Sequence, residues 1–482
     1  MITGSFIEYF NTHRGTRVNK RILFLMTIVF IVINGVDASA NSAPSYWRGK
    51  DSSEILAIDK STPIEVVGEN LIFDFNEGIG SFSEAFGKVT ASYKMVNTSE
   101  DEAIVQMAFP FISSFKSLNS EKIQILADGQ EVEKEIYPSG INLKNNSLSE
   151  DKAESLLSLE NIFLSLNNSY EGKILKEDTK RRLIKILITP ENVSEINIAL
   201  NLNYNEEKSK IIAFGINGFH TEEGKVELTS WCNGEEYIEL LILGEDIDYD
   251  INGYTDGEKT KETAEFSREI NVQEVSVADY LIDKTKEYYQ GDSSIISEDI
   301  LYKSMVKRLE ESFENSFAFG IDLQNMAHSE EIFIILYTVN FKGGEEKEIE
   351  VSYNALGSAD RRETENPVYT YNYLLNPAEN WKSFKDLKIE IIPPKEAPYI
   401  INSTLELNRT EEGHYVGNYQ ELPKEDLSFS LYENDKITLA NKISKKFSGL
   451  LYGAYFLMPI IVILALVIIG ALWIVRRENK KL

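Results

Sequence analysis

Cysteine is nearly absent from this sequence, since its 482 residues include one, Cys232. A lone cysteine cannot form an intramolecular disulfide, which excludes the class of small, disulfide-stapled secreted modules. A lipoprotein anchor needs a cysteine at the cleavage site of the leader, and the residue there is Asn41. The sequence nearest to a sortase signal, residues 422–426 (LPKED), lacks the Thr-Gly pair. Both of these covalent anchors are therefore excluded.

Catalytic signatures are also missing from the sequence. It contains no His-Glu-x-x-His, no Gly-x-Ser-x-Gly and no phosphate loop. Outside the leader the histidines are His220, His328 and His414, which stand far apart without ligand spacing. Cys232 is expected at a strand end and is interpreted as inert. Carboxylates are so abundant that no pair for glycoside hydrolysis can be singled out, and we favour a non-enzyme.

Basic residues are scarce relative to acidic ones. The 49 Lys and Arg against 77 Asp and Glu give a formal net charge of −28. Such a surface repels nucleic acid, so we expect no nucleic-acid partner. It suits cations, basic partners or simple solubility. The apolar content of 43% is ordinary for a globular protein, so disorder does not explain the charge.

A short hydrophobic segment lies near the N-terminus, at residues 22–33. Basic residues precede it, among them Arg17, Lys20 and Arg21, and Ala38-Ser39-Ala40 follows it. A basic region, a short apolar core and a small-x-small site predict a signal peptide over residues 1–40. An uncleaved membrane anchor is the alternative interpretation.

A longer hydrophobic segment covers residues 455–475, enough for a helix to span a hydrocarbon core of about 30 Å. Arg476 and Arg477 follow at once, which keeps the tail, residues 476–482, in the cytoplasm. The two segments together predict a single-pass protein of a bacterial cell membrane. Its N-terminal part would be extracellular, and its C-terminal helix would be its contact with the membrane.

The pattern between these segments predicts a mainly β chain, α+β overall. We expect two antiparallel β-sandwich-like domains with a helical insert, plus the one C-terminal transmembrane helix. An N-terminal β-rich domain would cover residues 41–270 and a helical segment 271–320. A membrane-proximal β-sandwich at 321–435 and a stalk at 436–454 would follow.

Two hairpins are predicted in the first domain. Residues 88–96 alternate between apolar and polar side chains, residues 103–111 form a second apolar run, and a short polar turn joins them. The second hairpin would join residues 122–126 to 132–136 through Asp128-Gly129, a pair that tolerates positive φ.

Three helices are predicted from the apolar spacing, over residues 151–166, 277–289 and 298–319. Ser276 and Asp279 form a capping box for the second helix. The third carries an i+4 stripe, for which core packing is the main interpretation and a partner-binding groove or oligomer seam the alternative: Leu301, Met305, Leu309, Phe313 and Phe317.

An acidic motif predicts a calcium site. Asp248, Asp250, Asn252 and Asp256 occupy positions 1, 3, 5 and 9 of an EF-hand-like loop, with Gly253 at position 6. Position 12 holds a lysine where the loop needs a bidentate glutamate. An acidic surface loop without calcium is therefore the alternative, and no other cofactor is expected.

An aromatic cluster follows at Tyr369, Tyr371, Tyr373 and Trp381, with asparagines interleaved. Flat aromatic rings beside amide groups could stack on sugar rings or contact a protein partner. Aromatic strands in a sandwich core produce the same string, so both interpretations stay open.

The segment that holds this cluster, residues 369–391, resembles stretches in uncharacterised single-pass surface proteins of clostridia-like bacteria. The predicted hairpin that ends in Phe109-Pro110-Phe111 is similar to the first sandwich of such proteins. The resemblance implies a β-sandwich fold at the cell surface and no catalytic residues.

Three functions are consistent with these observations. The leading hypothesis is a membrane-anchored extracellular protein with a non-catalytic binding, adhesion or accessory role, whose partner is a membrane protein or the cell wall. The first alternative is a membrane-anchored hydrolase that acts on the cell wall, and the second is a calcium-stabilised structural ectodomain.

Overall fold

The structure is a computed structural model of the chain. It describes residues 46–47, 50–59, 61–76, 85–118, 122–142, 170, 172–177, 179–222, 225–259, 264–288, 296–313, 317–443 and 445. The predicted leader, the helix at 151–166, the membrane span and the tail lie outside these ranges. Among the helices that the structure describes, none has the length and apolarity to cross a membrane.

The chain divides into two compact units. The smaller one includes β1 (Tyr46–Trp47) and residues 360–367. Within it the Arg362 guanidinium lies 4.6 Å from the centre of the Tyr46 ring, and Lys442 pairs with Glu363 at 2.6 Å. The larger unit, residues 48–359 and 368–435, is mainly β and mostly antiparallel, as predicted.

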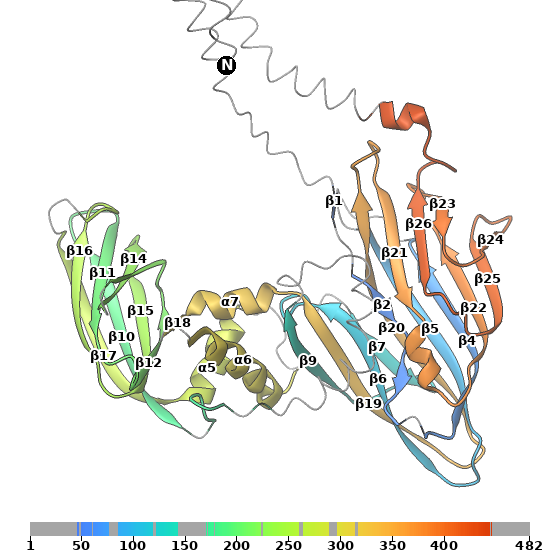
Figure 1. Cartoon of the computed structure of the whole chain (residues 1–482), viewed down its shortest axis with the longest axis horizontal. Coiled ribbons are helices and arrows are strands. Elements are labelled where there is room, and N and C mark those ends of the chain that lie inside the picture. The colour runs from blue at the N-terminus through green and yellow to red at the C-terminus, as the bar shows by residue number, and fades with distance from the viewer. Residues whose placement is uncertain are drawn as a thin grey trace, which may run out of the picture. The chain divides into compact units, whose positions relative to one another are not determined.

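The largest sheet combines strands from both ends of the larger unit (Figure 1). Its order is β23-β26-β21-β20-β5-β4-β22-β25-β24. The bounds are β4 (Ile64–Asp74), β5 (Ala85–Asn97), β20 (Glu346–Asp360), β21 (Val368–Leu374), β22 (Lys385–Ile392), β23 (Tyr399–Ser403), β24 (Asn408–Arg409), β25 (Tyr415–Glu421) and β26 (Leu427–Tyr432). A short strand, β2 (Ser52–Ser53), pairs in parallel with β21.

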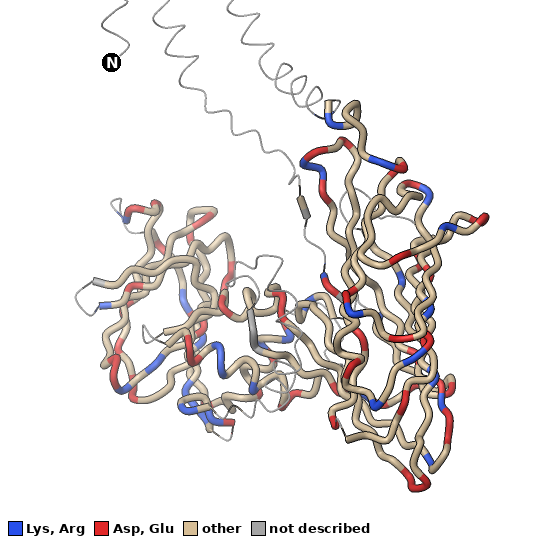
Figure 2. Tube along the Cα trace, turned by 45° about the vertical axis from the view of Figure 1, so that its right-hand side comes forward, with Lys and Arg blue, Asp and Glu red and all other residues tan. Residues whose placement is uncertain are grey.

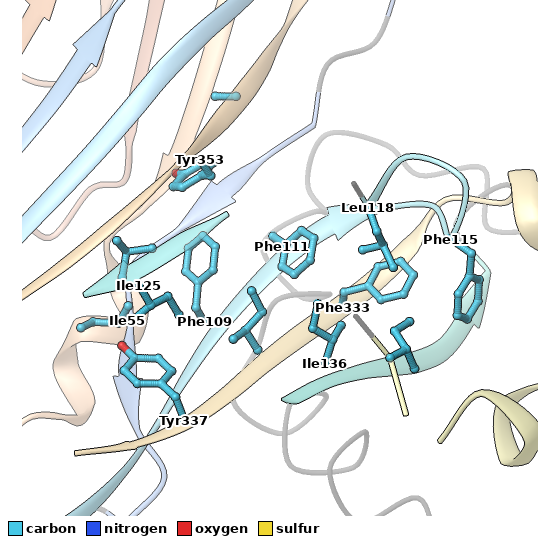
Figure 3. Close-up of a cluster of buried hydrophobic side chains, with 14 of the residues drawn as sticks. Ile55, Phe109, Phe111, Phe115, Leu118, Ile125, Ile136, Phe333, Tyr337 and Tyr353 are labelled. Atoms are coloured by element: carbon cyan, nitrogen blue, oxygen red, sulfur yellow. The ribbon is translucent and has the colours of Figure 1, made fainter. Parts of the chain in front are cut away.

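A second sheet has the order β3-β6-β19-β9, with β3 (Leu56–Ala57), β6 (Ala103–Ser113), β9 (Lys134–Asn142) and β19 (Glu331–Phe341). Its buried aromatic residues pack in a row (Figure 3). Ring centres of Phe109 and Phe111 lie 5.9 Å apart, and those of Phe111 and Phe333 lie 5.8 Å apart. Phe109 also contacts Tyr353 of β20 at 5.1 Å, which joins this core to that of the largest sheet.

The first predicted hairpin is wrong in its pairing, although both of its strands exist. Strand β5 pairs with β4 and β20, whereas β6 pairs with β3 and β19. Alternation tells which face of a strand is buried but not which strand lies beside it. The connection between β5 and β6 steps from one sheet to the other. The Asn97 amide holds the crossing by donating to the carbonyls of Asp101 and Lys342 at 2.8 and 3.0 Å.

The second predicted hairpin is confirmed at its turn, whereas residues 134–136 of its expected second strand belong to β9 and pair with β19. Strands β7 (Gln124–Ala127) and β8 (Gln130–Glu131) pair across Asp128 and Gly129, whose φ angles are 50° and 76°. Two positive φ angles in succession are those of the two-residue turn that Asp-Gly favours. The Asp128 carboxylate also accepts from the backbone N–H of Glu348 at 3.0 Å.

A second pair of sheets is built from residues 180–276 and 317–319, between β9 and β19 in the sequence. One sheet has the order β17-β10-β15-β12-β18 and the other β13-β14-β11-β16. They pack face to face through aliphatic residues such as Ile186, Leu240 and Leu200. The bounds are β10 (Lys180–Pro190), β11 (Ile196–Asn203), β12 (Ser209–Phe214), β13 (Gly218–Glu222), β14 (Lys225–Cys232), β15 (Glu236–Gly244), β16 (Asp248–Tyr254), β17 (Phe266–Ser276) and β18 (Phe317–Phe319).

Three α-helices follow this pair of sheets: α5 (Val277–Tyr288), α6 (Glu298–Ser312) and α7 (Gly320–His328). The predicted cap of α5 is present, since the Asp279 N–H donates to the Ser276 hydroxyl at 3.3 Å. Helix α6 ends at Ser312, before the predicted end at residue 319, because Phe317 belongs to β18 and pairs with β12. The stripe residues Leu301, Met305 and Leu309 are buried, as core packing requires.

Strand pairing crosses the interval at residues 271–320 that we expected to lie between two domains. Residues 64–97 and residues 346–432 share the largest sheet, and residues 180–276 form separate sheets with residues 317–319. The local patterns on which we placed the boundaries carry no information about pairing between strands so far apart in the sequence. Residues of both charge signs are distributed over all of these sheets (Figure 2).

Substitution of Gly87 on β5 would test the packing of the core that the largest sheet encloses, because Gly87 contacts the Phe75 ring. A Cβ added at Gly87 would lie 2.1 Å from Cε1 of Phe75, a ring that is 1% exposed and stands 4.6 Å from the ring of Tyr371. Because this ring has no room to move, we expect Gly87→Ala to lower the free energy of unfolding by about 1–3 kcal/mol in urea titrations.

The matched control for this substitution is Gly68→Ala in the neighbouring strand β4. The nearest atom to an added Cβ there is the Asp386 carbonyl oxygen at 3.9 Å, an ordinary contact. This variant should unfold at nearly the parent urea concentration. Equal destabilisation by the two substitutions would contradict the packing of Phe75 against Gly87.

Candidate functional site

The predicted calcium loop is a strand. Asp248, Asp250 and Asn252 lie on β16, paired in register with Asn203, Asn201 and Ala199 of β11. Alternate residues of a strand stand about 6.6 Å apart, so Asp248 and Asn252 are about 13 Å apart, while calcium ligands lie about 2.4 Å from the ion. The three side chains therefore do not converge on one ion.

The reason for this difference is that positions 1, 3 and 5 of a calcium loop have the same period as one face of a strand. Ile251 and Gly253, on the other face, are buried, and a Cβ at Gly253 would lie 2.4 Å from Ile196. Asp256 follows the strand, and its carbonyl accepts from Asn197 at 3.3 Å. In the part of the chain that the structure describes, no three His, Cys, Asp or Glu side chains are grouped to hold a metal.

The predicted aromatic contact surface lies in the core. Tyr369, Tyr371, Tyr373 and Trp381 are each at most 8% exposed. Tyr371 stacks on Phe429 at 5.3 Å, and the Trp381 indole N–H donates to the Ile55 carbonyl at 3.2 Å. These rings occupy the inner face because the first three alternate along β21 at the strand period. The core interpretation holds for this cluster, and a binding surface is excluded.

The residues discussed for catalysis are not brought together. Cys232 is buried, and burial raises the pKa of its thiol to about 11, which leaves it protonated and unreactive at neutral pH. His220 lies on β13 and His328 at the end of α7. His414 precedes β25, where its Nδ1 lies 3.0 Å from a Glu390 carboxylate oxygen.

Two buried glutamates form a cluster that sequence reasoning missed. Glu54, between β2 and β3, is 0% exposed, and Glu69 of β4 is 4% exposed. Tyr93 of β5 is the cross-strand partner of Glu69 and donates to Glu54 Oε2 at 2.5 Å. Tyr373 of β21 supplies a fourth buried polar group on the other side. This set, Glu54, Glu69, Tyr93 and Tyr373, is called the acid cluster below.

A β-bulge directs Glu69 inward. The pairing of β4 with β5 shifts register between Val66 and Gly68, so the buried positions change from even to odd residue numbers. Without that extra residue, alternation from Ile64 and Val66 would place Glu69 outside. The sequence does not reveal this bulge, and alternation without it predicts that the Glu69 side chain faces solvent.

Burial dominates the chemistry of the acid cluster. It raises the pKa of Glu54 to about 7, against hydrogen bonds from Tyr93, Glu69 and Tyr373 that lower it. It also raises the pKa of Glu69 well above its usual range, and the nearby Glu54 charge raises it further. Burial therefore favours the protonated form of both carboxyls in the folded protein. The cluster is enclosed, so it can hold a proton rather than meet a substrate.

Other buried carboxylates are compensated by cations. Glu239 of β15 accepts from the Tyr280 hydroxyl at 2.5 Å and pairs with Lys284 and Lys185 at 3.4 and 3.3 Å. Burial alone would raise the pKa of Glu239, but the Tyr280 hydroxyl and the two lysines lower it overall. Glu331 of β19 is 0% exposed and pairs with Arg308 of α6 at 2.7 Å. These contacts tie the helices α5 and α6 to strands.

A surface cleft of about 310 Å³ lies among the start of β10 and the first turns of α5 and α6. Its lining includes four carboxylates, of Glu177, Asp279, Glu298 and Asp299. Two of them are neutralised, since Glu298 pairs with Lys286 at 2.6 Å and Asp299 with Lys303 at 2.7 Å. The remaining pair and Lys180 make this a polar cleft suited to a small cationic or hydrogen-bonding group.

Strand β17 forms an open edge of its sheet. Its eleven residues pair with β10 on one side, and in the described part of the chain no strand pairs with the other side. Eight consecutive residues, 267–274, are exposed. They include Ile270 and Val272, which are 40% and 53% exposed. An edge of this length presents a row of backbone donors and acceptors to another strand.

Comparisons with known proteins identify no family. No protein family matches the sequence, and no curated protein matches it. Among solved structures, a protein of Legionella pneumophila described as a "putative nutrient binding protein" is similar at 9% identity with a TM-score of 0.34. The match covers 80% of this chain and 72% of that one.

The acid cluster makes stability depend on pH. The folded pKa of Glu54, about 7, lies above its ordinary value of 4.5, so its contribution is complete below about pH 4.5 and is lost as the pH rises toward 7. Glu54→Gln keeps an acceptor for Tyr93 but cannot ionise. We expect its free energy of unfolding, relative to the parent, to rise by about 1.4 kcal/mol per pH unit across that interval.

Urea unfolding at several pH values between 4.5 and 8 would measure this difference. Glu346→Gln makes the same chemical change at a glutamate that is 51% exposed and pairs with Lys94, and is the control. A difference between Glu54→Gln and the parent that does not vary with pH would show that Glu54 is ionised in the folded protein throughout.

Proposed function

We propose that this chain is a membrane-anchored extracellular protein with a non-catalytic binding or accessory role, and that β17 is its contact surface. The open edge of β17 is the observation that supports this most directly. An extended partner segment can add to such an edge through main-chain hydrogen bonds, with affinity increased by the exposed Ile270 and Val272. The bond pattern of the sheet would simply continue into the partner.

The proposed location rests on the sequence. The leader at residues 1–40 and the apolar segment at 455–475, followed by Arg476 and Arg477, support a single-pass protein with its strands outside the cell. The two pairs of packed sheets would be its two sandwich-like parts, with helices α5–α7 as the insert. The resemblance of residues 369–391 to surface proteins of clostridia-like bacteria supports the same location at the cell surface.

A cell-wall hydrolase is the second candidate, and the polar cleft is the observation that favours it. Glu177 and Asp279 are the carboxylates of the cleft that would serve as acid and base. If this candidate is right, Asp279→Asn should abolish release of soluble fragments from purified cell walls by the full chain. An unchanged rate, or no release by the parent, would leave the binding role.

Capture from native membranes tests the binding role. The full chain, tagged and cross-linked in its membranes, should retain one stoichiometric partner. We expect Val272→Lys to reduce that partner by at least about tenfold, because it places a solvated charge on the edge that must be covered. Ile104→Lys, at an isoleucine of β6 that is 72% exposed, is the matched control and should leave capture unchanged.

The same preparation tests the anchor. The protein should remain in the membrane pellet after alkaline carbonate extraction, and protease added to intact cells should cleave it. Release by carbonate would contradict the proposed membrane span. Capture that is equal for the parent and both lysine variants would show that β17 is not the contact surface.

A further inference from the structure

The sequence of β17 is complementary to itself when it is read in the opposite direction. The strand runs Phe-Ser-Arg-Glu-Ile-Asn-Val-Gln-Glu-Val-Ser from residue 266 to 276, and Asn271 is its central residue. In an antiparallel pair centred on Asn271, Arg268 lies opposite Glu274 of a second copy. Ile270 then lies opposite Val272, and Asn271 lies opposite itself.

These opposed residues share one face of the strand, apart from Asn271. Arg268, Ile270, Val272 and Glu274 alternate along β17, so all four point to the same side of the sheet. On that side the two copies would place an apolar centre, two isoleucines and two valines, between two pairs of opposite charges. Directly opposed residues of these kinds stabilise antiparallel pairing.

The charges select this register. A shift of the centre to residue 270 would put Arg268 opposite Val272, and a shift to residue 272 would put it opposite Ser276. Only the pairing centred on Asn271 satisfies both charged residues of that face. On the other face it opposes Glu269 to Gln273, so no two like charges meet.

We infer that two copies of this chain associate by antiparallel pairing of their β17 strands, related by a two-fold axis through Asn271. The pairing would join the two five-stranded sheets into one continuous sheet and remove their open edges. A two-fold interface requires a surface that is complementary to itself, which is the property that β17 has. This inference rests on the proposed function, since both assign contact to β17, and it names the partner as a second copy.

Cysteine substitution tests the register in the full chain. Residues directly opposed in an antiparallel pair have Cα atoms about 4.5–5.5 Å apart, within reach of a disulfide. We expect Asn271→Cys to give a disulfide-linked dimer under mild oxidation in native membranes, read on a non-reducing gel. The parent should give none, because its single cysteine, Cys232, is buried.

Two further variants serve as matched controls. Arg268→Cys lies on the same exposed strand, but the two-fold axis would hold its sulfurs about 20 Å apart, so it should not cross-link to itself. Glu274→Cys should behave in the same way. Cells that express both variants should form the mixed disulfide, because these two positions are opposed across the interface.

A charge swap tests the pairing without cysteine. Arg268→Glu would oppose two carboxylates, and we expect it to reduce the dimer fraction of the detergent-solubilised full chain at least about fivefold. The double variant with Glu274→Arg restores opposite charges in the reverse sense and should recover the dimer. Failure of the double variant to recover it would contradict the proposed register.

The outcomes separate this inference from the proposed function. No self-disulfide from Asn271→Cys, together with a different partner whose capture depends on Val272, would overturn the dimer and keep β17 as a binding edge. Equal cross-linking by Asn271→Cys and Arg268→Cys would indicate collision rather than pairing and would also overturn it. Loss of both the disulfide and the Val272-dependent capture would overturn the two together.

Discussion

Pairing of β19 and β20 with strands near the N-terminus is the constraint on which the rest of the larger unit depends. Strand β19 lies between β6 and β9, and β20 pairs with β5, so residues 85–142 and 331–360 form one connected framework. The Asn97 amide donates to the carbonyls of Asp101 and Lys342, where the β5–β6 and β19–β20 connections pass from one sheet to the other. The segment between β9 and β19 begins and ends at two strands that pair with each other. It can therefore form separate sheets without changing the pairing of the framework.

The buried carboxyl groups of the larger unit lie in two kinds of environment. Glu239 and Glu331 pair with lysine or arginine side chains and connect helices to strands. Glu54 and Glu69 lie beside two tyrosines, and burial raises the pKa of both carboxyls, so their protonated forms are favoured. The bulge that turns Glu69 inward creates this second kind of site and makes the largest sheet sensitive to rising pH.

The open edge of β17 differs from the opposite edge of the same sheet. At the other end of the same sheet, β18 has three residues and is followed at once by α7. Long exposed edges carry a risk of uncontrolled pairing, which charged residues reduce. The two charges on one face of β17 meet opposite charges in one register and neutral residues in the shifted ones, so the residues that protect the edge can also specify its occupant.

The sequence by itself determined the mainly β fold class and several local elements. Period-two alternation located β5, a continuous apolar run located β6, the Asp-Gly pair located the turn between β7 and β8, and the capping serine located the start of α5. These signals work because each depends on neighbouring residues.

Tertiary structure alone decided the strand partners, the burial of Glu69 and the face on which the aromatic residues lie. Asp248, Asp250 and Asn252 show the reason: a spacing of two residues fits a cation-binding loop and a strand equally well, and the burial of Ile251 against the facing sheet made it a strand. Local sequence carries the period of a segment, whereas burial and pairing depend on residues far along the chain.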